Sequence, residues 1–248
     1  MSRMNTAAMV RERIKQYIVE NQLAPGDAMP SEATLCQELE VSRSSVREAI
    51  SQLGALDMVH VEHGRGIFVG EISLAPLVNS VLFRFQLDHR GELACLTDVV
   101  QVRRALDLGQ AQAVVENMHG RYNDELHTIV NAMMEKGLQG QDFMPEDKSF
   151  HVLMQQSVAD NRLLPDLTGA FWEIHMAASK SLRESVPQDI DDTIRAHGDM
   201  LAAAEAGDVA AYRAAVIAHY QPLLRRIEET PQPASVSAPQ SGAESAAS

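Results

Sequence analysis

The strongest constraint on the fold lies in the first 70 residues, where three stretches of helical periodicity are separated by two short breaks. The first stretch, residues 7 to 21, places Val10, Ile14 and Ile18 on one face of a helix. The segment LAPGDAMP ends this helix, because proline lacks the backbone N–H that a helix interior needs and glycine favours turns. A helix, a turn-forming break and further helices are therefore predicted.

A serine precedes each of the next two helices. Ser31 can cap a short helix that runs to about Glu40, and Ser42 can cap the one after it. The inward stripe of the third helix consists of Val46, Ala49, Ile50 and Leu53. Because only Val41 and Ser42 separate the second helix from the third, the two must be joined by a tight turn.

Two short β-branched segments follow in MVHVEHGRGIFV, on either side of His63-Gly64-Arg65-Gly66. The glycines permit the positive φ of a tight turn, so the segment is predicted to be a β-hairpin. Three helices followed by a hairpin form a winged helix-turn-helix. We assign this domain to residues 1–70.

The remainder of the chain shows a different pattern. From about Leu93 to Glu229 the periodicity is helical throughout, with no strand pattern, and its breaks predict about six helices. The predicted fold class is therefore mainly α, with an all-α bundle at residues 93–229 after the winged helix-turn-helix. We expect residues 71–92 to be a linker and the Pro/Ser/Ala-rich residues 230–248 to be a disordered tail.

Composition restricts where the protein works. A chain of 248 residues that is 45% hydrophobic can bury a core in each of two domains. The spacing of Cys36 and Cys95 matches no metal or redox motif and allows no disulfide framework. The chain has no run of about 18 apolar residues and no signal-peptide pattern at its start. We therefore expect a cytoplasmic protein without a membrane partner.

The net charge of −13 is unevenly distributed. Residues 1–70 contain 7 Lys and Arg against 9 Asp and Glu, and the rest of the chain contains 14 against 25. A surface that binds nucleic acid is basic at least locally. Any such surface is therefore expected to be a small patch in the first domain.

The third helix carries a candidate patch. Arg43 and Arg47 lie one turn apart, with the short hydroxyl side chains of Ser44 and Ser45 beside them. A guanidinium group can bind the O6 and N7 edge of guanine or a phosphate, and short side chains let the backbone approach the major groove. Double-stranded DNA is the partner that such a helix suits.

Two further positions fit the same partner. Arg65, at the tip of the hairpin, can enter the minor groove, and the helix that begins after Ser31 can direct backbone N–H groups at a phosphate. The alternative for all of these residues is a solvated helix face beside an ordinary hairpin, because exposed charged faces are common.

Beyond these local patterns, LAPGDAMPSEATL, VSRSSVREAISQL and HGRGIFV resemble the DNA-binding domain of the GntR family of bacterial transcription regulators. The resemblance runs from about residue 8 to residue 70 and implies DNA contacts by Arg43, Arg47 and the hairpin residues His63, Gly64, Arg65 and Gly66. The sequence departs from the family pattern at Ala33, where many members carry an arginine, and at Asp57, where a glycine is usual. Asp is among the residues that tolerate a left-handed backbone.

The helical part contains a candidate metal site. Asp147 and His151 are neighbours one turn apart on a helix, so one cation can contact both. His197 and His219 lie at similar distances on either side of a predicted turn near residue 207, so antiparallel helices bring them side by side. Three imidazoles and a carboxylate suit zinc, nickel or manganese. The alternative is that each histidine is an ordinary surface or core residue.

The order of these residues resembles the effector domain of the FadR-like branch of GntR regulators, over about residues 93 to 229. The resemblance implies a bound divalent metal that helps to hold a small carboxylate effector. VRRALDLGQAQAV resembles the first bundle helix of that branch, whose arginine faces the cavity, which makes Arg103 the candidate for the effector carboxylate. The alternatives are a surface Arg103 paired with Asp107, or the neighbouring Arg104 as the binding residue.

Together these features predict a homodimeric regulator that binds a palindromic operator and is a repressor, with an organic acid at the metal site controlling its DNA affinity. Two other functions remain open on the sequence. One is a metal-dependent enzyme, since a histidine-rich site with an open position also suits catalysis. The other is a ligand-binding protein whose DNA-binding domain has degenerated, a hypothesis motivated by Ala33 and Asp57.

Overall fold

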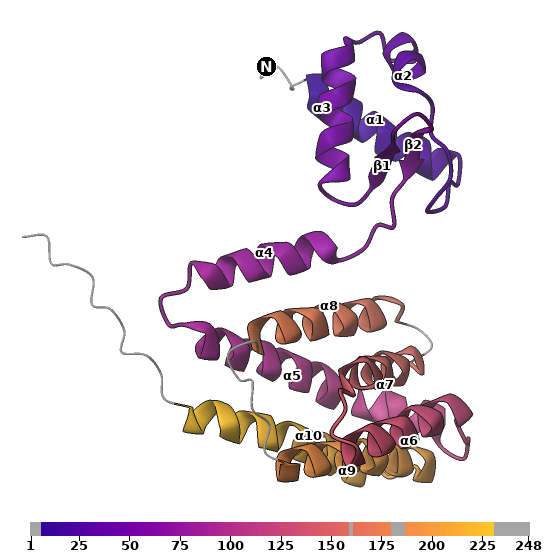
Figure 1. Ribbon diagram of the computed structural model, residues 1–248. Helices are drawn as coiled ribbons and strands as arrows, with labels where there is room; N and C mark the ends of the chain where they lie inside the picture. Colours follow the sequence, from indigo (N-terminus) through magenta and orange to yellow (C-terminus); the bar gives the residue numbers. More distant parts are fainter. Residues whose placement is uncertain (1–5, 159–160, 180–186, 231–248) are drawn as a thin grey trace, which may run out of the picture. The chain divides into compact units, whose positions relative to one another are not determined.

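The computed structural model describes residues 6–158, 161–179 and 187–230 (Figure 1). The chain divides into two compact units, Met1–Ser80 and Val81–Ser248, and each is described separately. The predicted disordered tail at 230–248 lies, apart from residue 230, outside the described residues. Among the residues described, no helix has the length and apolar character needed to cross a membrane.

The first unit contains three helices and a hairpin. These elements are α1 (Thr6–Glu20), α2 (Glu32–Glu38), α3 (Arg43–Gly54), β1 (Val59–Glu62) and β2 (Gly66–Val69). The two strands pair antiparallel, with Val59 opposite Val69. Their inward side chains complete one core with the helices, which includes Val10, Ile14, Leu35, Val46, Leu53 and Ile67. This is the predicted winged helix-turn-helix.

Local interactions explain the ends of these elements. The side chains of Ser31 and Ser42 accept hydrogen bonds from the backbone N–H groups of Thr34 and Ser45, so both predicted caps are present. Asp57 adopts a φ of 56°, the left-handed conformation that the sequence required of it. Asp57 thus supplies the left-handed residue between α3 and β1.

The segment expected as a linker contains a helix. Residues 71–92 include α4 (Ala75–Gln86), and the division between the two units falls within it. The side chain of Val78 is buried, whereas Phe83 is exposed. More than half of its residues are apolar, with Val78, Leu82 and Phe85 at helical spacing, and the side chain of Ser73 accepts a hydrogen bond from the backbone N–H of Ala75. The interpretation of this segment as a linker did not use these signals.

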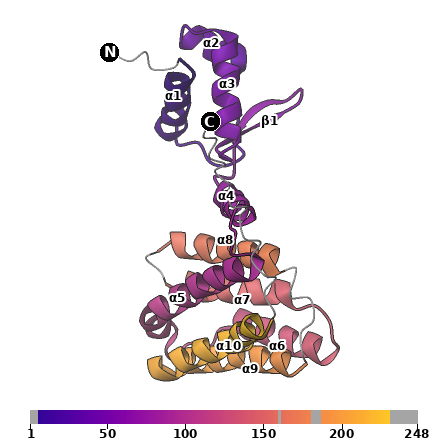
Figure 2. The same cartoon turned by 90° about the vertical axis from the view of Figure 1, so that its left-hand side faces the viewer.

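The second unit is a helical bundle within the described residues. Its six helices after α4 are α5 (Glu92–Met118), α6 (Asp124–Leu138), α7 (Met144–Gln156), α8 (Leu163–Ala178), α9 (Pro187–Ala206) and α10 (Val209–Glu229). The long α5 packs against α8, α9 and α10, and α9 lies beside α10 (Figure 2). The predicted fold class, a winged helix-turn-helix followed by a helical domain, is confirmed.

The hydrophobic core of the bundle includes side chains from α7, α9 and α10. Phe150, Met154, Met200, Leu201 and Tyr212 are among its most deeply buried side chains. Polar side chains also face inward on these helices, where burial makes them costly unless they are paired. The candidate site lies in this polar part of the interior.

Candidate functional site

The predicted DNA-reading face of α3 is exposed. Arg43, Ser44 and Arg47 are open to solvent, and Ser45 is half-buried beside the cap of the helix. The guanidinium of Arg47 lies 3.9 Å from a carboxylate oxygen of Glu32, a loose contact between exposed groups. Both arginines are therefore free to contact an external anion.

The hairpin presents its residues in the same exposed manner. His63, Gly64, Arg65 and Gly66 are all open to solvent, and both glycines have a positive φ. Arg65 forms an ion pair with Glu62 and its guanidinium carbon lies 5.5 Å from the centre of the Phe68 ring. These contacts hold the arginine over the hairpin and leave its remaining donors exposed.

Four buried side chains of the second unit converge on one point. Asp147 and His151 come from α7, His197 from α9 and His219 from α10, and one potential ligand atom from each lies within 4.8 Å of the others. The ring centres of His197 and His219 are 4.4 Å apart. The structure thus brings together all four residues that the sequence proposed as metal ligands.

The protonation of His197 follows from its neighbours. Its Nδ1 lies 2.9 Å from the backbone carbonyl oxygen of Thr193, which can only accept a hydrogen bond, so Nδ1 carries the proton. Nε2 of the neutral ring is then an acceptor, and it lies 3.0 Å from Oδ1 of Asp147. Two acceptors that face each other in a buried site need a cation or a proton between them.

His151 has a comparable arrangement. Its Nδ1 lies 3.2 Å from Oδ2 of Asp107, and its Nε2 lies 3.1 Å from Nε2 of His219. Nε2 of His151 and Nε2 of His219 thus face the interior of the cluster, whereas Nδ1 of His151 faces outward to Asp107. An outer hydrogen bond that orients a ligating imidazole is a regular property of metal sites in proteins.

Burial sets the charge of the cluster. It lowers the pKa of His197, and it holds the pKa of His219 well below the ordinary value, so both rings are neutral. Burial opposes ionisation of Asp147, but its close contact with His197 and the charge of Arg103 outweigh burial and hold the pKa of Asp147 well below the usual range. Neutral imidazoles and an ionised carboxylate are the forms that bind metals, so the residues fit a divalent ion.

Asp147 is held from its other side. Its Oδ2 accepts a hydrogen bond of 2.5 Å from Nε1 of Trp172 on α8. The same oxygen lies 3.6 Å from Nη2 of Arg103. The indole therefore fixes the carboxylate, so that Oδ1 is directed at the histidines.

Arg103 is a buried cation, with 3% of its side chain exposed. Its Nη1 contacts Nδ1 of His175, whereas neither Nε nor Nη2 has a hydrogen-bond partner among the described residues. Burial and the charge of Arg103 lower the pKa of His175 to about 3, so this ring is neutral and its Nδ1 can accept from the guanidinium. Arg103 does not pair with Asp107, contrary to one alternative from the sequence.

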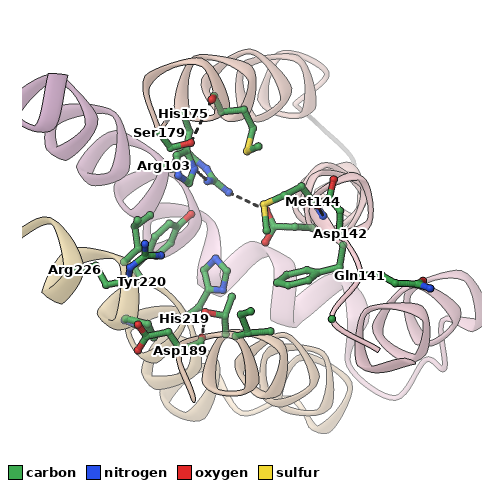
Figure 3. Close-up of a pocket in the computed structure, with 18 residues that line it drawn as sticks. Arg103, Gln141, Asp142, Met144, His175, Ser179, Asp189, His219, Tyr220 and Arg226 are labelled. Atoms are coloured by element: carbon green, nitrogen blue, oxygen red, sulfur yellow. Dashed lines mark hydrogen bonds and ion pairs between the residues drawn. The ribbon is translucent and has the colours of Figure 1, made fainter. Parts of the chain in front are cut away.

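A cavity of about 450 Å³ adjoins the cluster. Arg103, His219 and Tyr220 line it together with polar and apolar side chains from α7 to α10 (Figure 3). Asp147 lines it as well. The other lining residues include Phe143, Met144, Met176, Ser179, Ile190, Thr193 and Leu223. Arg103 and two of the candidate metal ligands are thus accessible from one space, whereas Arg104 does not line it.

Sequence patterns did not identify several residues of this site. Asp107, Trp172, His175 and Tyr220 come from three different helices, and only the folded arrangement places them together. Tyr220 follows His219 directly, but no spacing rule distinguishes it from a core tyrosine. The single tryptophan was the one signal available, since a buried indole usually has a hydrogen-bond acceptor.

Comparison with known proteins places these features in a family. The family model described as "Bacterial regulatory proteins, gntR family" matches residues 6–69, and the "FCD domain" model matches residues 98–222. The HTH-type transcriptional regulator LutR of Bacillus subtilis (strain 168) is 27% identical over 213 residues, which cover 82% of this chain and 92% of that protein. The galactonate operon transcriptional repressor of Escherichia coli (strain K12) is 22% identical over 214 residues, or 86% and 93% of the two chains.

A solved structure shows the same fold. The chain described as Streptococcus agalactiae GntR superimposes with a TM-score of 0.63 at 21% sequence identity, covering 88% of this chain and 99% of that one. GntR regulators bind DNA, FCD domains bind small-molecule effectors, and the named relatives are regulators, not enzymes. The chain belongs to the GntR family of bacterial transcription regulators, in the branch that carries an FCD effector domain.

Proposed function

We propose that this protein is a homodimeric repressor that binds a palindromic operator and that a small organic acid, held at a metal centre in the helical domain, controls its DNA affinity. One observation carries the proposal. Asp147, His151, His197 and His219 direct ligand atoms at one buried point, beside a cavity that also exposes Arg103. A metal site next to a buried guanidinium suits a carboxylate ligand.

The buried charges support the same ligand. Asp107 and Asp147 contribute two negative charges and Arg103 one positive charge, while the buried imidazoles of His197 and His219 are neutral. With a divalent cation bound by neutral imidazoles, the two carboxylates and Arg103 leave a net charge of one positive. One monocarboxylate then restores neutrality, which a low-dielectric interior favours.

The donor set indicates the class of metal. Three imidazole nitrogens and one carboxylate oxygen suit zinc, nickel or manganese, and an ion with five or six ligands would have positions left for the effector. Such an ion, when bound, supplies a Lewis-acidic position for an oxygen of the effector. The protein's part is to orient the imidazoles, to exclude bulk water and to supply the guanidinium of Arg103.

On the DNA side, we propose that Arg43 and Arg47 contact base edges or phosphates in the major groove, with Ser44 and Ser45 permitting close approach. The hairpin residues His63 to Gly66 would contact the adjacent minor groove, and the N-terminus of α2 at Ser31 a phosphate. One such domain contacts few base pairs, so a dimer on paired half-sites is needed for specificity. The site of action would be the cytoplasm, where the DNA lies.

We propose repression relieved by the effector. The name of the Escherichia coli relative describes a repressor of a galactonate operon. It supports repression as the direction of regulation and sugar acids as one class of effector. The effector can lower DNA affinity only by binding better to the arrangement that does not bind the operator. Couplings of this kind are commonly about 1 to 3 kcal/mol, or roughly 5-fold to 150-fold in affinity.

The proposal is tested with metal-loaded full-length protein and labelled DNA from the region upstream of its gene. Anisotropy titrations at matched salt compare this DNA with a scrambled duplex, and specific binding should be tighter by about 10³ or more. Sugar acids, hydroxy acids and dicarboxylates are then added one at a time. At least one acid should release the operator, and only when metal is present.

Two arginine variants separate the functions of the domains. Arg103→Ala should retain operator binding and lose the response to the acid, because Arg103 is the buried cation of the cavity. Arg104→Ala is the matched control, since Arg104 neighbours Arg103 on α5 but does not line the cavity. An unchanged acid response in Arg103→Ala would remove Arg103 from the proposal. Equal, salt-sensitive binding to all DNA would instead favour a degenerate DNA-binding domain.

A further inference from the structure

We propose that Asp107 is a positioning residue of the metal centre, which fixes His151 in the one neutral form that can bind the ion. The proposal rests on the metal centre proposed above and concerns a residue that is not itself a ligand. Asp107 lies on α5, one turn after Arg103, whereas His151 lies on α7. The contact therefore joins two helices as well as two side chains.

Asp107 is surrounded by donors. Its Oδ2 lies 3.2 Å from Nδ1 of His151 and accepts a hydrogen bond of 2.7 Å from the hydroxyl of Tyr220. Its Oδ1 accepts a hydrogen bond of 3.0 Å from Nε2 of Gln155. Only 4% of the residue is exposed, so these three groups replace the water that an ionised carboxylate would otherwise bind.

This arrangement determines where His151 carries its proton. An ionised carboxylate can only accept, so the nitrogen that faces it, Nδ1, must be the N–H of the neutral ring. Nε2 then presents its lone pair to the cluster, 3.1 Å from Nε2 of His219 and 3.8 Å from Oδ1 of Asp147. The other tautomer would place an N–H where the metal must lie.

His151 is the ligand whose orientation can be tested by mutation. The outer nitrogen of His197 is held by the backbone carbonyl of Thr193, which no substitution removes. Nδ1 of His219 has no hydrogen-bond partner among the described residues. Of the three imidazoles, only that of His151 is thus oriented by a replaceable side chain.

The first test measures metal affinity. Zn²⁺ and Ni²⁺ are titrated into metal-free, full-length protein in competition with a chromophoric chelator. Asp107→Asn should bind each ion about 10-fold to 100-fold more weakly than the wild type, because an amide can present its NH₂ to His151 and favour the wrong tautomer. Asp107→Glu keeps a carboxylate and should recover part of this loss.

A matched control distinguishes positioning from a general change in charge. Asp142→Asn also neutralises a carboxylate that lines the cavity, but Asp142 caps the start of α7 and does not contact His151. Its metal affinity should equal that of the wild type. An equal loss in both variants would attribute the effect of Asp107→Asn to net charge and would overturn the proposal.

The second test observes the tautomer directly. Long-range ¹H–¹⁵N correlation spectra of histidine-labelled wild-type protein, assigned with His151→Gln, should show His151 protonated at Nδ1. This result needs no Asp107 variant, so it decides the matter even if Asp107→Asn does not fold. Protonation at Nε2 in the wild type, or unchanged metal affinity in a folded Asp107→Asn protein, would refute the role of Asp107. Failure of the wild type to bind any metal would instead refute the metal centre itself.

Discussion

Replacement of Asp147 by asparagine should have opposite effects with and without metal. In the metal-free protein, Nε2 of His197, an acceptor in the neutral ring, faces Oδ1 of Asp147 across 3.0 Å without a hydrogen-bond donor. An asparagine can keep the hydrogen bond from Trp172 through its oxygen and donate its NH₂ to His197. It also leaves Asp107 and Arg103 as a balanced pair of buried charges. The metal-free site should therefore tolerate the substitution.

The magnitudes follow from these contacts. One new hydrogen bond between neutral groups contributes about 1 kcal/mol, so the metal-free Asp147→Asn protein should equal or slightly exceed the wild type in its free energy of unfolding. At a metal concentration about 100 times the dissociation constant, the wild type gains about 2.7 kcal/mol. For a domain of this size that corresponds to an increase in Tm of roughly 5 to 10 °C. The variant, which lacks the one anionic ligand, should gain little.

The assay is thermal unfolding followed by far-ultraviolet circular dichroism, in chelator and in excess Zn²⁺, with Asp142→Asn as the control that keeps the metal-induced shift. The wild type and Asp147→Asn should exchange their order of stability between the two conditions. An equal metal-induced shift in both proteins would exclude Asp147 as a ligand. A loss of several kcal/mol by the variant in chelator would show that the carboxylate serves chiefly as the counter-ion of Arg103.

Three further predictions concern other parts of the molecule. Arg43→Ala should weaken operator binding by about 1 to 3 kcal/mol in anisotropy titrations, because one guanidinium contact is lost, whereas Arg13→Ala on α1 should change it little. Burial lowers the pKa of His175 to about 3, below its value near 6.5 in the unfolded chain, so the folded state binds fewer protons than the unfolded state. His175 alone should therefore cost the metal-free protein up to about 1.4 kcal/mol of stability per pH unit below about pH 6.5. In urea unfolding at several pH values, His175→Gln should reduce the slope by about this amount, and equal slopes would contradict the assignment. Gly70→Ala places a Cβ 2.3 Å from the backbone oxygen of Asp57 and should destabilise the first unit by about 1 to 3 kcal/mol in the same assay, and an unchanged midpoint would refute that clash.

Much of the fold was predictable because local rules act within single elements. The caps at Ser31 and Ser42 and the stripe from Val46 to Leu53 define the helices of the first unit without reference to any other part of the chain. Helix α4 also carries local signals, namely Ser73 next to its start and apolar residues at helical spacing, but the interpretation of residues 71–92 as a linker did not use them.

Part of the candidate site was predictable from residue spacing, and part was not. Asp147 and His151 share one helix, so their spacing predicts their proximity, and the antiparallel return of α9 and α10 brings His197 to His219. Asp107 also lies one turn from Arg103, and the same rule suggested a pair that does not form. The rotation of α5 against α7 and α8 decides instead which partners these two residues meet. That rotation depends on the packing of the whole bundle.

The hydrogen bond between Trp172 and Asp147 has a practical consequence. Trp172 is the only tryptophan of the chain, and its indole N–H is bonded to an oxygen of a candidate metal ligand. Its intrinsic emission therefore comes from a single chromophore whose local electric field depends on the charge at that carboxylate. The protein thus carries an optical reporter beside the candidate metal site, and binding of an ion there should change its emission in unlabelled samples.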